Sequence, residues 1–264
     1  MWIFFKSEKL RRYHTTLILI RLPVAYCVIY GKFIVTKRFF ITGTDTDIGK
    51  TLVACALLQS ITKAGYRTAG YKPVATGCEM TPEGLRNHDA LALIKNSSAT
   101  LCYEQVNPLA FLSPTSPHIA SRDAGQYIDV TLLSAGLRKL EDLAEWVIIE
   151  GAGGWFTPLA KSLTYADWVI AEQLPVVMVV GIKLGCINHA LLTQLAIENA
   201  KLPLLGWIAN HPIHSSHQLN DYILTLTQYL NAPFLGEIPW LNVLDQDNLT
   251  NYINFSYLET LTHK

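Results

Sequence analysis

The most chemically suggestive part of the sequence is a glycine-rich segment in which a lysine precedes a threonine. It reads ITGTDTDIGKT from Ile41 to Thr51, begins at the end of the apolar stretch RFFIT (38–42), and leads into residues 50–64, which have the apolar spacing of a helix. A turn between a strand and a helix directs backbone N–H groups and the positive end of the helix dipole at one point, where anionic oxygens bind. The segment is therefore predicted to be a phosphate-binding P-loop.

Two side chains of this loop have expected roles: Lys50 would reach the terminal phosphates, and the Thr51 hydroxyl would ligate Mg²⁺. Five residues rather than four separate Gly43 from Gly49, and Thr44 stands where a glycine is common, so an ordinary surface turn is the alternative. The intact GKT and the strand and helix around it favour the P-loop. We expect nucleotide contacts from Gly43, Thr44, Asp45, Thr46, Asp47, Ile48, Gly49, Lys50 and Thr51.

A second unusual residue is Lys72 in TAGYKPVATGCE, at the end of a stretch that reads as a strand. A lysine in a protein interior is costly to bury unless it has a partner. Near a phosphate site it would neutralise charge that develops during phosphoryl transfer. The alternative is that its amine extends to solvent.

Carboxylates also occur at the expected ends of elements. Glu150 ends the apolar stretch WVIIE, and Gly151, Gly153 and Gly154 leave the backbone free to approach a ligand. Mg²⁺ commonly takes one or two protein carboxylates and phosphate oxygens, which favours Glu150 as a metal ligand. Asp89 in NHDALAL begins a helical pattern, where capping alone explains an isolated acid.

A candidate for recognising the base is Asn210, which ends the stretch GWIAN. Its amide offers both a donor and an acceptor to the edge of a purine. The NKxD tetrad that reads guanine is absent from the sequence, so ATP is favoured over GTP. The histidines, including His118, show no partner pattern and no catalytic role is expected for them.

The elements that must position these residues alternate along the chain from Lys37 onward, which is typical of parallel βαβ units. Runs such as VVMVV are apolar on both faces, as in strands covered on both sides. We predict one P-loop NTPase-like α/β domain with a doubly wound, mostly parallel sheet, helices on both faces, and ligands at the carboxyl ends of the strands. Strands are expected at 38–42, 68–74, 146–150, 175–180, 204–210 and 234–239, and helices at 50–64, 89–95, 132–144, 187–200 and 218–230.

The composition and charge of the chain limit the classes of partner that we expect. The 264 residues are half hydrophobic and carry no formal net charge, so neither a nucleic acid nor another polyanion is an expected partner. Five cysteines without metal-ligand spacing indicate reduced thiols in the cytoplasm. Residues 1–36 carry six basic residues and one acid, and their longest uncharged run, 22–31, is too short to span a membrane.

We expect these first 36 residues to be an N-terminal extension outside the fold, with a weak interfacial anchor as the alternative. The functional domain is expected at 37–241 and a C-terminal tail at 242–264.

Six motifs together closely resemble the dethiobiotin synthetase family: GTDTDIGKT, GYKPVATG, NHDALAL, EGAGGWFTPL, KLGCINHALLT and GEIPWL. They occur in the family's order from about Lys37 to Leu241. The resemblance implies that CO2 and an amine of 7,8-diaminononanoate form a carbamate, which accepts the γ-phosphoryl group of ATP. The second amine then closes the ureido ring and releases phosphate.

The resemblance also implies roles for individual residues. Lys50 and Lys72 would flank the carbamate and the γ-phosphate, with the hydroxyls of Thr46 and Thr76, where the family commonly has serine at the latter position. Magnesium would be held by Thr51, Asp89 and Glu150, and adenine by Asn210 and the backbone around Pro239.

Family members are homodimers with the diamine site at the subunit interface. The matching positions here are Asn188 and Tyr222. Three alternatives remain: an ATP-dependent amidotransferase-type synthetase domain, a ParA- or MinD-like nucleotide switch, and a paralogue with a shifted diamine or no turnover.

Overall fold

The computed structural model describes residues 15–21, 26–32, 36–213, 219–241 and 248–262. The chain separates into two compact units, Met1–Thr36 and Lys37–Lys264. In the first unit, β1 (Thr15–Arg21) and β2 (Tyr26–Lys32) form an antiparallel hairpin in which Thr15 lies opposite Lys32. Neither strand was predicted from the sequence.

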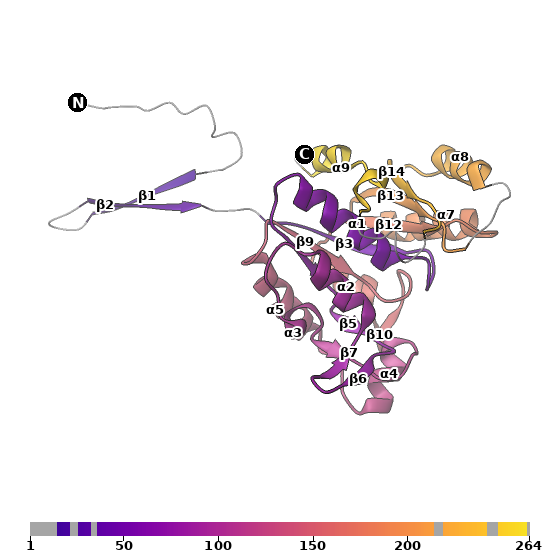
Figure 1. Cartoon of the computed structure of the whole chain (residues 1–264), viewed down its shortest axis with the longest axis horizontal. Coiled ribbons are helices and arrows are strands. Elements are labelled where there is room, and N and C mark those ends of the chain that lie inside the picture. The colour runs from indigo at the N-terminus through magenta and orange to yellow at the C-terminus, as the bar shows by residue number, and fades with distance from the viewer. Residues whose placement is uncertain (1–14, 22–25, 33–35, 214–218, 242–247, 263–264) are drawn as a thin grey trace. The chain divides into compact units, whose positions relative to one another are not determined.

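The second unit is built on a parallel sheet of six strands in the order β14-β13-β12-β3-β9-β4 (Figure 1). Every neighbouring pair in this sheet is parallel, so all six carboxyl ends meet at one edge. This confirms the predicted fold class. The strands are β3 (Lys37–Gly43), β4 (Thr68–Tyr71), β9 (Trp146–Glu150), β12 (Val176–Gly181), β13 (Leu204–Asn210) and β14 (Phe234–Ile238).

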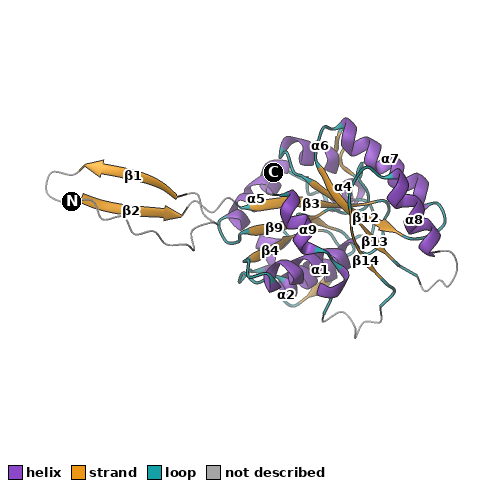
Figure 2. Ribbon diagram, turned by 90° about the horizontal axis from the view of Figure 1, so that it is seen from above, coloured by secondary structure: helices purple, strands orange, loops and turns teal. Residues whose placement is uncertain are grey.

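Helices cover both faces of this sheet, with α1, α2 and α9 on one face and α5 to α8 on the other (Figure 2). Alternate residues of β3 face opposite layers: Phe39 and Ile41 pack with α1, while Phe40 packs with α5 and α6. This explains why the strands read as continuous apolar runs. The helices are α1 (Lys50–Lys63), α2 (His88–Asn96), α3 (Tyr103–Val106), α4 (Pro117–Ala124), α5 (Val130–Glu141), α6 (Tyr165–Ala171), α7 (Cys186–Asn199), α8 (Leu219–Tyr229) and α9 (Phe255–Leu261).

One predicted strand is corrected by the structure. The expected strand at 68–74 ends at Tyr71, and Val74–Ala75 forms a separate short strand, β5, which pairs with β8 (Leu109–Ala110). Pro73 has no N–H to continue the ladder, and the N–H of Lys72 donates instead to the carbonyl of Val106. The break turns the chain at Lys72, so this lysine stands at the sheet edge where ligands bind. Short hairpins complete the fold: β6 (Glu79–Thr81) with β7 (Gly84–Arg86), and β10 (Pro158–Ala160) with β11 (Leu163–Thr164).

The described residues of the expected tail pack against the main domain. Leu249, Phe255 and Leu258 are buried in the same core cluster as α1. The N–H of Asn254 donates to the carbonyl of Leu235 in β14. Residues 248–262 therefore belong to the same compact unit as the sheet. Within the described ranges, no helix has the length and apolar character needed to cross a membrane.

Candidate functional site

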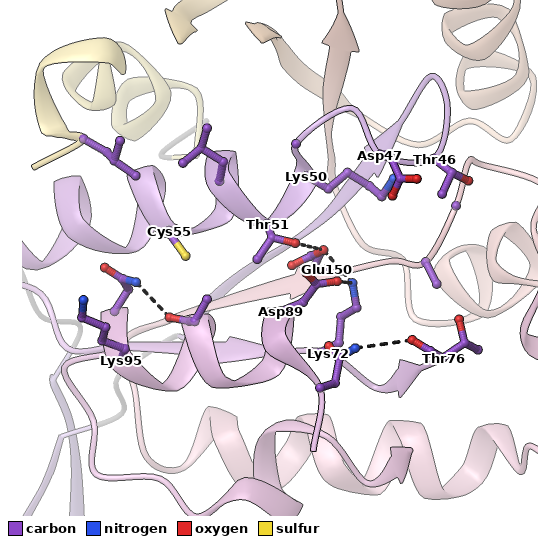
Figure 3. Close-up of a pocket in the computed structure, with 18 residues that line it drawn as sticks. Thr46, Asp47, Lys50, Thr51, Cys55, Lys72, Thr76, Asp89, Lys95 and Glu150 are labelled. Carbon is purple, nitrogen blue, oxygen red and sulfur yellow. Dashed lines mark hydrogen bonds and ion pairs between the residues drawn. The ribbon is translucent and has the colours of Figure 1, made fainter. Parts of the chain in front are cut away.

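A cavity of about 710 Å³ opens at the carboxyl ends of β3, β4 and β9 (Figure 3). The loop after β3, the starts of α1 and α2, and the glycine segment after β9 surround it. The cavity brings together ten of the predicted site residues: Thr46, Asp47, Gly49, Lys50, Thr51, Lys72, Thr76, Asp89, Glu150 and Gly153. Residues that the sequence analysis did not name also line it: Leu52, Cys55, Asn87, Ala92, Lys95, Asn96, Ala152 and Leu249.

The loop between β3 and α1 has the backbone of an anion-binding turn. Asp47 and Gly49 both have positive φ, at 56° and 87°. A side chain at Gly49 would also collide with Asn210, because a Cβ there would lie 2.2 Å from Nδ2. Asn210 is buried, and its Nδ2 donates to the carbonyl of Ile48 at 2.8 Å. The end of β13 therefore holds the loop in shape, and Gly49 is needed for that close contact.

Lys50 is the first residue of α1, and its amine folds back over the loop. Its Nζ donates to the carbonyl of Asp45 at 2.8 Å, and the side chain is buried. Burial, with the positive charge of Lys72 nearby, lowers the pKa of Lys50 to about 8. A buried cation held by one carbonyl can move to a stronger anionic partner, as a phosphate-binding lysine must.

Lys72 does not extend to solvent, since it is 4 % exposed. Its Nζ lies 2.6 Å from Glu150 Oε1 and 2.7 Å from Asp89 Oδ2. Burial favours the neutral amine, but the two carboxylates outweigh burial and raise the pKa of Lys72 to about 12. A permanently charged lysine therefore lies in the cavity beside the phosphate loop.

Thr51, Asp89 and Glu150 supply the oxygen atoms of the cavity. The Thr51 hydroxyl donates to Glu150 Oε1 at 2.8 Å, and Glu150 Oε2 is buried with no hydrogen-bond partner in the described part of the chain. Burial raises the pKa of the Glu150 carboxyl, whereas the charge of Lys72 overcomes burial and lowers the pKa of Asp89. An unpaired buried carboxylate oxygen beside a hydroxyl and a second carboxylate fits a Mg²⁺ ion, which prefers oxygen ligands.

Within the described ranges, no group of three or more His, Cys, Asp or Glu side chains is placed to hold a metal ion. The predicted set contains two carboxylates, so a metal here would need further oxygens from a bound phosphate or water.

The glycines after β9 allow the chain to pass close to the phosphate loop. A Cβ at Gly151 would lie 2.5 Å from the ring of Phe40, and one at Gly154 would lie 3.4 Å from the carbonyl of Gly43. Gly153 has a φ of 65°, and its neighbour Gly154 donates its N–H to the Thr157 hydroxyl. Larger residues would push this segment away from the cavity.

Ten predicted site residues lie outside the cavity lining: Gly43, Thr44, Asp45, Ile48, Gly151, Gly154, Asn188, Asn210, Tyr222 and Pro239. Thr44 donates its N–H to the carbonyl of Val179, and the carboxylate of Asp45 pairs with Lys183. Pro239 follows β14 and is partly exposed, Asn188 is exposed in the first turn of α7, and Tyr222 is partly buried in α8. Gly43, Ile48 and Asn210 are buried beneath the loop.

Comparison with known proteins decides the family. A family model described as an AAA domain matches residues 37–248. The ATP-dependent dethiobiotin synthetase BioD 1 of Salmonella typhi is 59% identical over 225 residues, which are 85% of this chain and 99% of that protein. The BioD 1 protein of Escherichia coli K12 is 58% identical over 84% of this chain and 100% of its own length. The chain belongs to the dethiobiotin synthetase family.

Membership of this family places the chain among ATP-dependent ligases. It confirms the resemblance drawn from the six motifs. The identity extends over nearly the full length of these relatives.

Solved structures confirm the fold at much lower identity. A chain of the MinC:MinD cell division protein complex of Aquifex aeolicus matches with a TM-score of 0.51 and 12% identity, over 86% of this chain and 95% of that one. A ParA family ATPase from Chlorobium tepidum matches with a TM-score of 0.50 and 12% identity, over 87% and 100%. These likenesses show a shared P-loop fold, and at such identity they do not carry over the activity of a nucleotide switch.

Two asparagines that bind the backbone of the segment from Lys72 to Thr76 were not identified from the sequence. Asn87 caps α2 by accepting from the N–H of Ala90, and its Nδ2 reaches the carbonyl of Thr76 at 3.4 Å. Asn107 is buried, and its Nδ2 donates to the carbonyl of Lys72 at 2.7 Å. The cap could have been inferred from the asparagine that precedes HDALAL, but no local pattern points from Asn107 to Lys72.

Proposed function

We propose that this protein closes the ureido ring of dethiobiotin from 7,8-diaminononanoate and CO2, with Mg²⁺ and ATP, and releases ADP and phosphate. The observation that carries the proposal is the meeting of Lys50, Lys72, Thr51 and Glu150 in one cavity of a chain 58–59% identical to proteins named ATP-dependent dethiobiotin synthetase. The names of the relatives suggest the reaction, and the cavity contains side chains that suit its chemistry.

ATP would bind with its phosphates across the loop after β3. Backbone N–H groups of the loop and of the start of α1 would donate to the phosphate oxygens, and Lys50 would leave the carbonyl of Asp45 for the terminal phosphates. Burial lowers the pKa of Lys50, so without a ligand the amine holds its proton less strongly than it would in water. A bound phosphate would favour the charged form of Lys50 again.

The chemistry proceeds in three bond changes. An amine nitrogen of the diamine bonds to the carbon of CO2 and loses a proton, which gives a carbamate. A carbamate oxygen then bonds to the γ-phosphorus while the bond from that phosphorus to ADP breaks, which gives a carbamic-phosphoric anhydride. The second amine bonds to the carbonyl carbon and loses a proton, the carbon–oxygen bond to phosphate breaks, and the ring closes as phosphate leaves. No histidine base is required in this sequence of steps.

The two lysines would offset the repulsion between two anions, the carbamate and the triphosphate. Lys72 is held charged by Glu150 and Asp89, so it can stabilise the negative charge on the transferring group without first gaining a proton. The hydroxyls of Thr46 and Thr76 would orient the carbamate, and Gly151, Gly153 and Gly154 would let the backbone approach it. Positioning would supply much of the rate enhancement.

Thr51, Asp89 and Glu150 would hold Mg²⁺, which neutralises phosphate charge when it is bound. Without the metal ion, the carboxylates of Asp89 and Glu150 would repel the phosphates of the nucleotide. Lys72, which bridges both carboxylates in the structure, would then be free to turn toward the substrate.

Asn210 and the backbone around Pro239 would recognise adenine. Asn210 Oδ1 is buried and has no hydrogen-bond partner in the described part of the chain. An acceptor oxygen suits the amino group of adenine and opposes the carbonyl of guanine. The orientation of this amide therefore supports ATP over GTP.

We also propose a homodimer whose diamine site lies between subunits, with Asn188 and Tyr222 reaching the substrate of the partner. Support comes from leucines that are exposed on α7, α8 and the loop before α7: Leu184, Leu192, Leu195 and Leu224. Large apolar side chains on neighbouring helices are typical of a protein interface. The free thiols of Cys55, Cys78, Cys102 and Cys186 suit the cytoplasm as the location.

The proposal is tested with ¹³C-bicarbonate, ATP, Mg²⁺ and 7,8-diaminononanoate. The expected product is dethiobiotin heavier by one mass unit, since the ring carbon comes from CO2. A reaction without ATP is the control. Absence of labelled dethiobiotin while ATP is still hydrolysed would point to a paralogue with another substrate.

A further inference from the structure

The carboxylate of Asp45 belongs to the phosphate loop but is turned toward another loop. Its Oδ2 lies 2.7 Å from Lys183 Nζ, and its Oδ1 accepts the N–H of Thr46 at 2.8 Å. The two paired side chains are partly exposed, Lys183 by 37% and Asp45 by 41%. Both oxygens are therefore committed to partners within the described protein, and neither Asp45 nor Lys183 is among the described residues that line the cavity.

The sheet brings these two residues together across 138 positions of sequence. β12 lies beside β3 in parallel register, with Val179 opposite Gly43. The N–H of Thr44 extends this pairing by donating to the carbonyl of Val179 at 3.0 Å. The loops that follow the two strands therefore leave the same edge side by side, and Lys183 stands two residues beyond the end of β12.

Asp45 also has two further effects on the loop. Its carbonyl accepts Lys50 Nζ at 2.8 Å, and its Oδ1 fixes the N–H of the next residue, Thr46. A rotation of the Asp45 side chain toward the cavity would release Thr46 and bring a negative charge toward the place where phosphates are expected. Such a charge would oppose polyphosphate binding unless a cation compensated it.

We propose that Lys183 is a positioning residue for the nucleotide: it neutralises Asp45 and keeps the phosphate loop in the form that accepts a polyphosphate. The inference rests on the proposed function, because it assumes that the loop binds ATP. Lys183 acts through Asp45 and touches neither the substrate nor the reacting atoms.

The electrostatics of the pair agree with this role. The hydrogen bond from Lys183, together with its charge, lowers the pKa of Asp45, although partial burial opposes the shift. The carboxylate is therefore charged at neutral pH, and its neutralisation depends on the lysine. His189 of α7 adds a weaker positive influence when protonated.

The pair also connects the phosphate loop to the start of α7. The carbonyl of Lys183 accepts the N–H of Cys186, the first residue of that helix. The same helix carries Asn188, which is proposed to face the diamine of the partner subunit. Because Lys183 acts through Asp45 of the phosphate loop, a change at Lys183 is expected to affect mainly the affinity for nucleotide. Turnover at saturating ATP should be less affected.

The test measures ADP binding by calorimetry in the full-length protein. Lys183→Met is expected to weaken ADP binding about three- to fivefold, as for a partly exposed ion pair. Lys183→Arg should bind ADP as the wild type does, because it keeps the charge. Exposed Lys139 of α5 provides the matched control, and Lys139→Met should leave ADP affinity unchanged.

Two further results separate this role from a structural one. The loss of ADP affinity caused by Lys183→Met should be smaller at 500 mM KCl than at 50 mM KCl. The Debye length falls from about 14 Å to about 4 Å over this range, so salt screens the Lys183–Asp45 pair of the wild type. In an Asp45→Asn background, Lys183→Met should change ADP affinity by less than about twofold, since no carboxylate remains to neutralise.

If Lys183→Met lowered ADP affinity equally in the wild-type and the Asp45→Asn backgrounds, the inference would be overturned and the proposed function would still stand. Wild-type ADP affinity in Lys183→Met would also overturn it. Failure of the wild-type protein to bind ADP at all would instead overturn the proposed function, and the inference with it. Thermal unfolding of each variant shows whether it is folded, and the comparison within the Asp45→Asn background keeps the test valid if Lys183→Met is unstable.

Discussion

The ammonium group of Lys72 lies 2.6 Å from Oε1 of Glu150, and both side chains are almost completely buried. Removing one member of such a pair leaves an uncompensated charge in the interior, which costs about 3–5 kcal/mol when nothing replaces it. The carboxylate of Asp89 also pairs with the ammonium group of Lys72, and the Asp89 side chain is more exposed than that of Glu150. The buried pair holds the lysine in the cavity, and the Asp89 contact joins it to the start of α2.

Lys72→Ala is expected to lower kcat by at least roughly tenfold while the protein still binds nucleotide. The lysine would contribute most when charge develops on the transferring group, so its loss would affect turnover more than ground-state binding. Turnover with the diamine and ADP binding by calorimetry measure the two effects. Lys139→Ala is the control, and unchanged kcat in Lys72→Ala would remove this lysine from the proposed mechanism.

Glu150→Gln is expected to raise the Mg²⁺ concentration needed for half-maximal activity by roughly tenfold, because a charged metal ligand becomes neutral. ADP affinity in excess EDTA should be unaffected by the change. A titration of activity against MgCl2 makes the measurement, with exposed Glu104→Gln as the matched control. An equal Mg²⁺ requirement in wild type and variant would show that Glu150 holds no metal.

Cys55 is expected to resist alkylation at pH 8, although it lines the cavity. Burial, with the negative charge of Glu150 nearby, raises the pKa of this thiol to about 12. The thiolate is the nucleophile, so the reactive form becomes abundant only as the pH approaches that value. Peptide mapping after brief iodoacetamide treatment should find Cys102, which is exposed, modified at pH 8 and Cys55 unmodified. Equal labelling of both would contradict the burial of Cys55.

Leu258→Ala in α9 is expected to destabilise the domain by about 2–5 kcal/mol, the range for a buried leucine. Leu258 is fully buried in the cluster that contains α1, whereas its neighbour Tyr257 is 43% exposed. Tyr257→Ala is therefore the matched control and should cost much less. Urea unfolding measures both variants. A Leu258→Ala protein as stable as the wild type would show that this segment is not part of the cooperative core.

The sequence predicted the sheet and the main helices because their signals are local. Apolar runs between helical patterns locate β3, β9, β12 and β13 to within about a residue of the observed bounds, and the loop before Lys50 has its own composition. The expected strand at 68–74 was too long because the pattern stayed apolar past Tyr71, while Pro73 had already ended the ladder.

The contacts that hold the site were not predictable in the same way. Lys183 reaches Asp45 because β12 lies beside β3, and Asn107 reaches the carbonyl of Lys72 from a loop 35 residues away. Such contacts depend on strand order, which no short window of sequence contains. Helix α9 was missed because seven residues are too few for a clear periodic pattern.

Diamine-dependent release of phosphate from ATP, with dethiobiotin measured by mass in the same sample, tests the central proposal most directly. We predict phosphate release that requires both 7,8-diaminononanoate and bicarbonate, with one phosphate for each dethiobiotin formed. Phosphate release that is independent of the diamine, or no dethiobiotin at all, would contradict the proposed function.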